Sequence, residues 1–127
     1  MFLFGEKIGM AFQIKDDLLD FGDEQTGKPK GIDVKEKKLT LPLIYALSKA
    51  EASEKRRIIR MIKQDSESAA TFTAVYDLIV AQGGMEYARA RMNQYRDEAF
   101  EILFSMPESP ARTSLEQLVY FVTDRKN

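Results

Sequence analysis

Apolar positions recur at intervals of three and four along most of the chain, and no convincing alternating strand interrupts them. Residues 2–21 are apolar nearly all round, which predicts a largely buried helix. A second helix is predicted from Thr40 or Leu41, because Pro42 suits a first helical turn. Residues 22–39, between these helices, are rich in glycine and charge and predict a long loop that is either functional or disordered.

The rest of the chain predicts four more helices. One is expected from Ser53, and the next ends at Gly83 and Gly84. The longest pattern ends at Pro107, and Ser109 is the expected N-cap of the last helix. The apolar positions behind these helices are Ile58, Ile59 and Ile62; Phe72, Val75, Tyr76, Ile79 and Val80; Met85, Ala88, Met92, Tyr95, Ala99 and Ile102; and Leu115, Leu118, Val119 and Val122. The pattern predicts an all-α fold of about six helices.

Composition and charge narrow the class of protein. The 127 residues suffice for a single domain over 1–127, and the hydrophobic share of 44% is typical of a globular chain. A net charge of -1 argues against a nucleic-acid partner bound through bulk charge. No apolar run approaches the roughly 20 residues of a transmembrane helix, and the N-terminus does not have the order of a signal peptide. A cytoplasmic location is therefore expected.

The chain contains neither cysteine nor histidine. This excludes disulfides, thiolate metal sites, cysteine nucleophiles and Ser-His-Asp triads. Any metal would need oxygen ligands, which suits Mg²⁺ or Ca²⁺.

A narrow polar stripe crosses the otherwise apolar first helix. Its members, at intervals of three and four, are Gly9, Gln13, Asp16 or Asp17, and Asp20. No lysine or arginine shares the stripe, and buried carboxylates this close repel each other unless a positive charge compensates them. Either the stripe is a solvated acidic face, or a hard divalent cation completed by waters and a phosphate neutralises it.

Charges of opposite sign follow one another beyond this helix. Acidic residues crowd positions 16–24, and lysines crowd positions 28–38. If the loop folds back over the helix end, metal and lysine cations together would suit a diphosphate. The alternative is an ordinary charged surface loop whose lysines pair with the aspartates.

Three linked blocks carry a family resemblance. They are Phe12-Gln13-x-x-Asp16-Asp17-x-x-Asp20, Gly27-Lys28-Pro29-x-Gly31-x-Asp33 and Lys38-x-Thr40-Leu41-Pro42. In this order and spacing they resemble the second aspartate-rich motif, with its flanks, of trans-polyprenyl diphosphate synthases. The later helices resemble the C-terminal region of that family, so the resemblance spans essentially the whole chain.

The resemblance implies the C-terminal portion of an isoprenoid-synthase helical bundle. Members of the family condense isopentenyl diphosphate with an allylic diphosphate, and Mg²⁺ helps the allylic diphosphate to ionise. By resemblance, Asp16 binds the metal directly, and Asp17 and Asp20 act through waters or hold the geometry. The residues implied to contact substrate are Phe12, Gln13, Lys28 and Lys38. The implied catalytic residues are Lys28 and the three aspartates.

The chain also departs from the family pattern. The first aspartate-rich motif and the residues that bind isopentenyl diphosphate are absent from it, and Lys37 stands where relatives often have glycine. We therefore expect an incomplete domain that is inactive alone and pairs with the missing half, with another copy, or with both. Another copy is a candidate because such enzymes are commonly homodimers.

Other interpretations stay open at this point. The chain could be the small subunit of a heteromeric prenyl synthase, with the first motif supplied in trans. It could instead be a non-catalytic helical interaction module that binds a partner through the apolar positions of residues 85–102. The Gly-Lys and Lys-x-Thr-Leu-Pro blocks disfavour a terpene cyclase of related fold.

Overall fold

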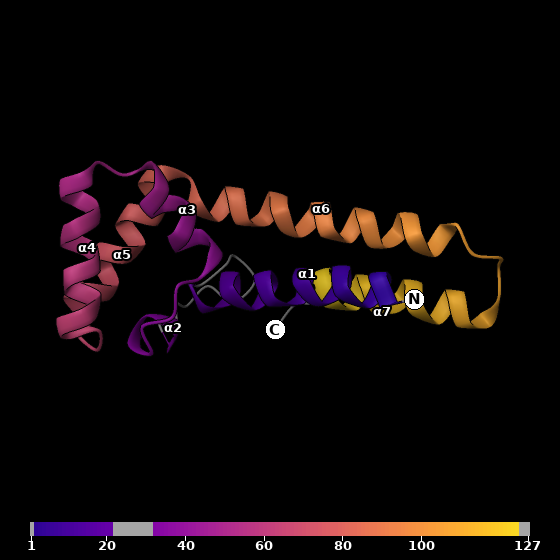
Figure 1. Ribbon diagram of the computed structural model, residues 1–127. Coiled ribbons are helices and arrows are strands. Elements are labelled where there is room, and N and C mark those ends of the chain that lie inside the picture. The colour runs from indigo at the N-terminus through magenta and orange to yellow at the C-terminus, as the bar shows by residue number, and fades with distance from the viewer. Residues whose placement is uncertain (1, 22–31, 125–127) are drawn as a thin grey trace. The chain divides into compact units, whose positions relative to one another are not determined.

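The computed structural model describes residues 2–21 and 32–124, and every regular element in these ranges is a helix. The elements are α1 (Phe2–Asp20), α2 (Ile32–Lys35), α3 (Leu41–Lys49), α4 (Ala52–Asp65), α5 (Ala69–Gln82), α6 (Gly84–Phe104) and α7 (Pro110–Asp124) (Figure 1). The all-α prediction is confirmed. The described residues contain one helix more than the pattern predicts, because the short α2 lies within the predicted loop.

The chain divides into two compact units. One comprises residues 1–16 and 89–127, and the other comprises residues 17–88. Both boundaries fall inside long helices, α1 and α6, rather than in a linker. A single domain over residues 1–127 remains a prediction. Among the described residues, no helix is long and apolar enough to span a membrane.

The unit of residues 17–88 is built around α3, α4 and α5. Ile58 and Ile62 of α4 are buried in its core together with Val75 and Ile79 of α5, as the helical spacing predicts. Val80, predicted on the same face, is 55% exposed. The core also includes Phe21 and Val34, which brings the end of α1 and the short α2 against α3–α5. This packing positions the candidate site.

The unit of residues 1–16 and 89–127 packs α1 against α6 and α7. Phe4 of α1 meets Ala99 and Leu103 of α6 and Val119 of α7 in a buried cluster. Leu118, predicted to be buried, is 44% exposed. The reason is helical geometry: with 3.6 residues per turn, adjacent positions point about 100° apart, so burial of Val119 turns Leu118 outward.

Two neighbouring glycines join α5 to α6 for different reasons. Gly83 ends α5 with φ of 73°, a left-handed conformation that glycine adopts without a steric penalty. The sequence predicts that Gly84, like Gly83, ends α5. In the structure Gly84 is instead the first residue of α6. A Cβ at this position would lie 2.5 Å from the carbonyl oxygen of Pro42, so a side chain does not fit between α6 and α3.

Candidate functional site

The predicted aspartates occupy the last turns of α1 but differ in exposure. Asp16 is exposed, whereas Asp17 and Asp20 are 8% and 7% exposed. Phe12 and Gln13, one turn earlier on the same helix, are also exposed. The polar stripe is therefore neither wholly solvated nor wholly buried: one carboxylate faces outward, and two are enclosed by the protein.

The enclosed carboxylate of Asp20 accepts a hydrogen bond from the backbone. Its Oδ2 lies 3.1 Å from the amide nitrogen of Asp33, in the first turn of α2. The first amides of a helix have no partner within the helix, and a carboxylate is a favourable acceptor for them. This bond joins the first and second motif blocks.

The second enclosed carboxylate faces the third motif block. Nζ of Lys38 lies 3.5 Å from Oδ1 of Asp17, and their side chains are 55% and 12% exposed. The predicted approach of a loop lysine to the acidic helix end is confirmed for this pair. An ordinary charged loop would form the same pair, so the pair locates Lys38 without by itself assigning a ligand.

A tight turn presents Lys38 at this position. The amide of Lys37 donates to the carbonyl of Val34 at 2.9 Å, and the amide of Lys38 donates to the carbonyl of Asp33 at 2.8 Å. These two bonds define a Schellman motif, whose penultimate position is left-handed. Lys37 holds that position with φ of 61°, the only non-glycine residue with positive φ in the described part of the chain. The predicted departure from glycine thus falls where glycine is the favoured residue.

Sequence reasoning assigned no role to Asp33, although it closes the second motif block. Partial burial raises the pKa of the Asp33 carboxyl, and the neighbouring charge of Asp20 raises it further. Lys38 acts in the opposite direction but does not outweigh them. The motif spacing was the available signal, but the juxtaposition of Asp33 with Asp20 depends on how α2 packs on the core.

The site has oxygen donors that suit Mg²⁺, but not a complete metal cage. Among the described residues, no group of three acidic side chains is arranged to hold a metal ion. Mg²⁺ commonly uses one or two carboxylates and completes its shell with waters and substrate phosphates. The exposed Asp16 beside two enclosed carboxylates fits an ion shared in this way. Lys28, the other predicted diphosphate lysine, lies outside the described residues.

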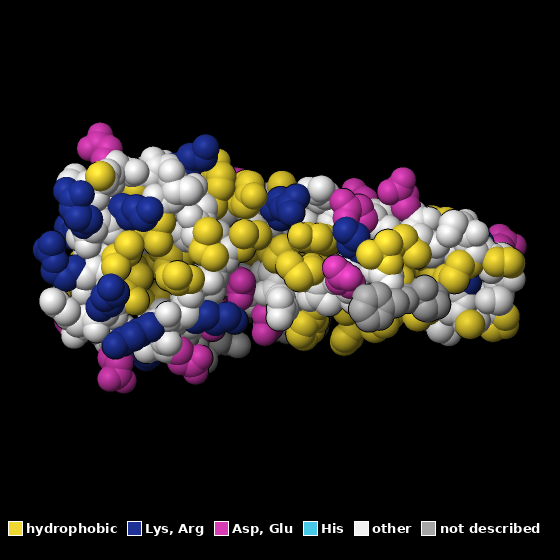
Figure 2. Space-filling model, in the orientation of Figure 1, with side chains coloured by type: hydrophobic (Ala, Val, Ile, Leu, Met, Phe, Trp, Pro, Cys, Tyr) yellow, Lys and Arg dark blue, Asp and Glu magenta, His cyan; other side chains and the backbone are white. Residues whose placement is uncertain are grey.

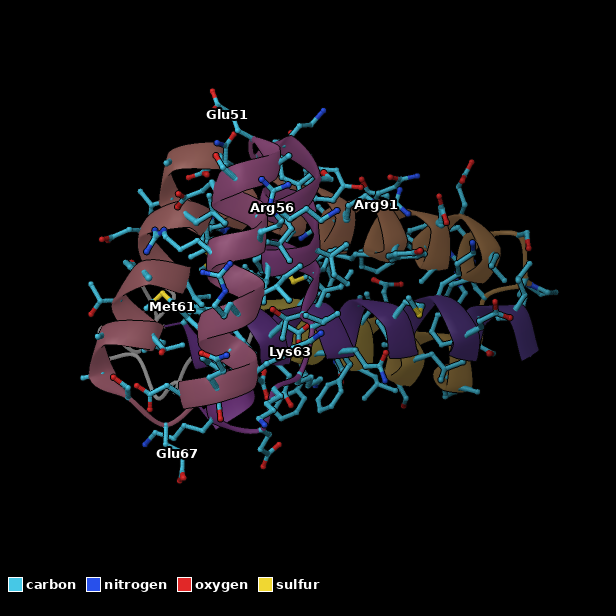
Figure 3. The ribbon with its side chains drawn as sticks, turned by 60° about the vertical axis from the view of Figure 1, so that its left-hand side comes forward. Glu51, Arg56, Met61, Lys63, Glu67 and Arg91 are labelled. Carbon is cyan, nitrogen blue, oxygen red and sulfur yellow. The ribbon has the colours of Figure 1, made fainter. Side chains whose placement is uncertain are left out.

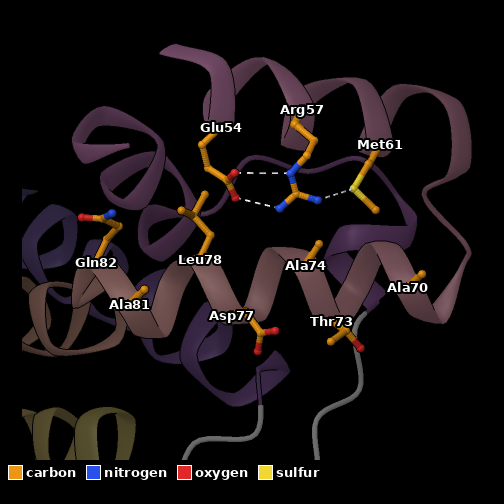
Figure 4. A pocket seen from close by; sticks show the side chains of 10 residues that line it. All are labelled: Glu54, Arg57, Met61, Ala70, Thr73, Ala74, Asp77, Leu78, Ala81 and Gln82. Carbon is orange, nitrogen blue, oxygen red and sulfur yellow. Dashed lines mark hydrogen bonds and ion pairs between the residues drawn. The ribbon is translucent and has the colours of Figure 1, made fainter. Parts of the chain in front are cut away.

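A separate groove runs between α4 and α5. It has a volume of about 770 Å³ and is lined by Arg57 and Met61 of α4 and Ala74 and Leu78 of α5 (Figure 4). Glu54 and Arg57, both of α4, form an ion pair on the α4 side of the groove, with 2.7 Å between Oε1 and a guanidinium nitrogen. None of the predicted site residues lines this groove, so the groove is not part of the candidate site.

Basic side chains gather on the outer surface of α4 (Figure 2). Arg56 and Lys63 are exposed there (Figure 3). Their exposure is typical of a solvated helix face.

Comparison with known proteins gives the class of protein. Residues 1–79 match the family model described as polyprenyl synthetase, which is more than half of the chain. The chain therefore belongs to the polyprenyl synthetase family.

Similar proteins match nearly the whole chain. It is 34% identical, over 98% of its length, to heptaprenyl diphosphate synthase component 2 of Geobacillus stearothermophilus, and covers 38% of that protein. It is 32% identical, over 98% of its length, to the chloroplastic solanesyl diphosphate synthase 1 of Arabidopsis thaliana, and covers 30% of it. The crystal structure of a decaprenyl diphosphate synthase from Rhodobacter capsulatus superposes with a TM-score of 0.86 at 33% identity, over 99% of this chain and 39% of that one. The chain thus spans between about three-tenths and two-fifths of these relatives.

Proposed function

We propose that this chain supplies the second aspartate-rich motif to the catalytic site of a trans-polyprenyl diphosphate synthase. The enzyme would condense isopentenyl diphosphate with an allylic diphosphate and so lengthen a prenyl chain. One observation carries the proposal: two later motif blocks converge on one helix end, where Lys38 faces Asp17 and the amide of Asp33 faces Asp20. Membership of the polyprenyl synthetase family supports the same class of reaction.

The three aspartates would divide the work of holding Mg²⁺. When bound, Mg²⁺ would neutralise charge that develops on the departing diphosphate. The exposed Asp16 would contact the ion directly. Asp17 and Asp20, each held by a donor from the protein, would orient its water shell. Mg²⁺ in such sites is commonly bound by phosphates of the substrate as well as by carboxylates. The diphosphate itself would therefore complete this site.

The remaining predicted residues would bind the substrates. Lys38 and Lys28 would act on the allylic diphosphate as point charges, which lysine can do without a fixed geometry. Phe12 and Gln13, exposed one turn before the aspartates, would lie beside the allylic substrate.

We infer that the chain needs a partner segment to act. It covers at most about two-fifths of the relatives reported above, and the first aspartate-rich motif is not in its sequence. The missing part could belong to the same polypeptide, to a second subunit, or to a homodimer. The Geobacillus relative is named component 2 of a heptaprenyl diphosphate synthase. This name supports the heteromeric alternative.

The test measures prenyl elongation, first by this polypeptide alone and then by an assembled complex. The chain is incubated with Mg²⁺, isopentenyl diphosphate and farnesyl diphosphate, alone and co-expressed with the part of the heptaprenyl relative that it does not match. We expect no product from the chain alone, long prenyl products from the complex, and a loss of about 100-fold in Asp16→Ala. The control Asp77→Ala, at an exposed carboxylate of α5, should keep full activity. Equal elongation by the Asp16→Ala complex would overturn the proposal.

A further inference from the structure

The C-terminal ends of α2 and α4 each donate a hydrogen bond to the other. Oγ of Ser66, directly after α4, donates to the backbone carbonyl of Lys35 at the end of α2, at 3.0 Å. In return, Nζ of Lys37, just after α2, donates to the carbonyl of Lys63 in the last turn of α4, at 3.1 Å. Figures 1 and 3 show the two helix ends, with Lys63 labelled in α4.

These bonds satisfy groups that a helix leaves unpaired. The last four carbonyls of a helix have no partner within it, and both acceptors are such carbonyls. The two donors are not equivalent, because Ser66 is 8% exposed whereas Lys37 is exposed. A buried hydroxyl must be hydrogen-bonded to avoid a desolvation penalty, so the Ser66 bond is the better fixed of the two.

The two helices differ in how firmly they are held. The longer α4 is anchored in the core by Ile58 and Ile62, which are 0% and 5% exposed. In contrast, α2 is a single turn, which is too short to be stable from its own hydrogen bonds. Val34 fixes one side of α2 in the core, and Ser66 fixes its C-terminal end. The end of α4 is therefore the anchor, and α2 is the element that it places.

We propose that Ser66 is a positioning residue for the diphosphate site. By holding the carbonyl of Lys35, it fixes the turn that follows α2, and this turn sets Lys38 opposite Asp17. The inference rests on the proposed function for what Lys38 binds, but the hydrogen-bonded link itself can be measured independently.

The chain offers a matched control for Ser66. Ser68, two residues later, is the N-cap of α5, and its Oγ accepts a hydrogen bond from the amide of Ala70 at 3.1 Å. Ser66→Ala and Ser68→Ala each remove one serine hydroxyl and one hydrogen bond from the same connection. Only the first bond reaches α2.

Amide hydrogen exchange on the whole chain tests the link. The reporters are the amides of Asp33, Lys37 and Lys38, which donate to Asp20, Val34 and Asp33. Ser66→Ala should speed their exchange about three- to tenfold, the equivalent of one hydrogen bond, while Ser66→Thr should restore protection. Ser68→Ala should leave them unchanged. Unchanged exchange of all three amides in Ser66→Ala would overturn the proposal, whether or not the enzyme is active.

Kinetics of the assembled complex then test the consequence for substrate. We expect Ser66→Ala to raise KM for the allylic diphosphate about three- to tenfold with kcat within about twofold, and Ser66→Thr to reverse the change. Ser68→Ala should leave KM unchanged. A complex in which Ser66→Ala leaves KM unchanged would overturn the positioning role. A wild-type complex that makes no product would count against the proposed function instead, and the exchange result would still decide the link.

Discussion

Nζ of Lys38 lies 3.5 Å from Oδ1 of Asp17, so the third motif block meets the first at the end of α1. Both residues belong to the compact unit of residues 17–88, in which Phe21 and Val34 share one core. The relationship therefore depends on the packing of α1 and α2 against α3–α5, and not on the pair alone.

Replacement of Lys38 should separate binding from stability. In Lys38→Met we expect the free energy of unfolding to change by less than about 1 kcal/mol, because an ion pair with an exposed lysine is worth little. The affinity of the assembled complex for inorganic diphosphate with Mg²⁺ should fall about tenfold, because a cation that faces the diphosphate is lost. Urea denaturation and titration calorimetry measure the two quantities. The control is Lys55→Met, on the exposed surface of α4. An unchanged affinity in Lys38→Met would show that Lys38 is only a surface ion-pair partner.

The left-handed conformation of Lys37 should cost stability. Lys37→Gly and Lys37→Ala both remove the Nζ bond to Lys63, but only glycine tolerates φ of 61° without strain. We expect the glycine variant to have the higher free energy of unfolding, by about 1 kcal/mol. Gly83→Ala makes the opposite change, because it places a Cβ at φ of 73°. It should lower the free energy of unfolding by a similar amount. Equal stability of the two Lys37 variants would contradict a left-handed Schellman position at Lys37.

The contact between α6 and α3 should not accept a side chain at Gly84. A Cβ there would lie 2.5 Å from the Pro42 carbonyl oxygen and 3.0 Å from a side-chain carbon of Ile79. Since the first of these is backbone, we expect Gly84→Ala to lower the free energy of unfolding by about 1–3 kcal/mol. Gly5→Ala, where nothing lies within 4 Å of the added Cβ, should raise it by about 0.5–1 kcal/mol. Urea denaturation distinguishes them, and a neutral Gly84→Ala would refute the close approach.

The raised pKa of the Asp33 carboxyl predicts a pH-dependent effect of Asp33→Asn. The folded chain binds the carboxyl proton of Asp33 more tightly than the unfolded chain does. The free energy of unfolding therefore falls as the pH rises above the unfolded-state pKa of about 3.9. Asp33→Asn should therefore raise the free energy of unfolding near pH 7, and the gain should shrink as pH falls toward 4. The amide of residue 33 still donates to Asp20 in this variant. A gain that is the same at both pH values would not come from this ionisation.

Much of the fold follows from periodicity. The pairs Ile58 and Ile62 of α4 and Val75 and Ile79 of α5 are buried, as their spacing predicts. In an amphipathic helix the apolar positions recur on the face that packs against the core. Val80 and Leu118 are exposed because an apolar residue at the edge of such a face can lie beyond the contact. The helix α2 was not predicted, since four residues carry no detectable periodicity.

The candidate site could be predicted only as a set of motif residues. The acidic stripe and the lysines after it are visible in the sequence, and this led to Asp17 and Lys38 being placed in one site. Asp33 and Ser66 could not be assigned roles in the same way. Their hydrogen bonds join segments 13 and 31 residues apart, and the packing of α2 against the core brings those segments together.

We propose that the acidic end of α1 and Lys38 together hold a diphosphate through Mg²⁺. The most direct test of this proposal is calorimetric titration of inorganic diphosphate, with and without Mg²⁺, into the assembled complex carrying wild-type chain, Asp16→Ala or the control Asp77→Ala. We expect binding that requires Mg²⁺, an affinity about tenfold or more weaker in Asp16→Ala, and no change in Asp77→Ala. The same affinity without Mg²⁺, or in Asp16→Ala, would contradict the proposal.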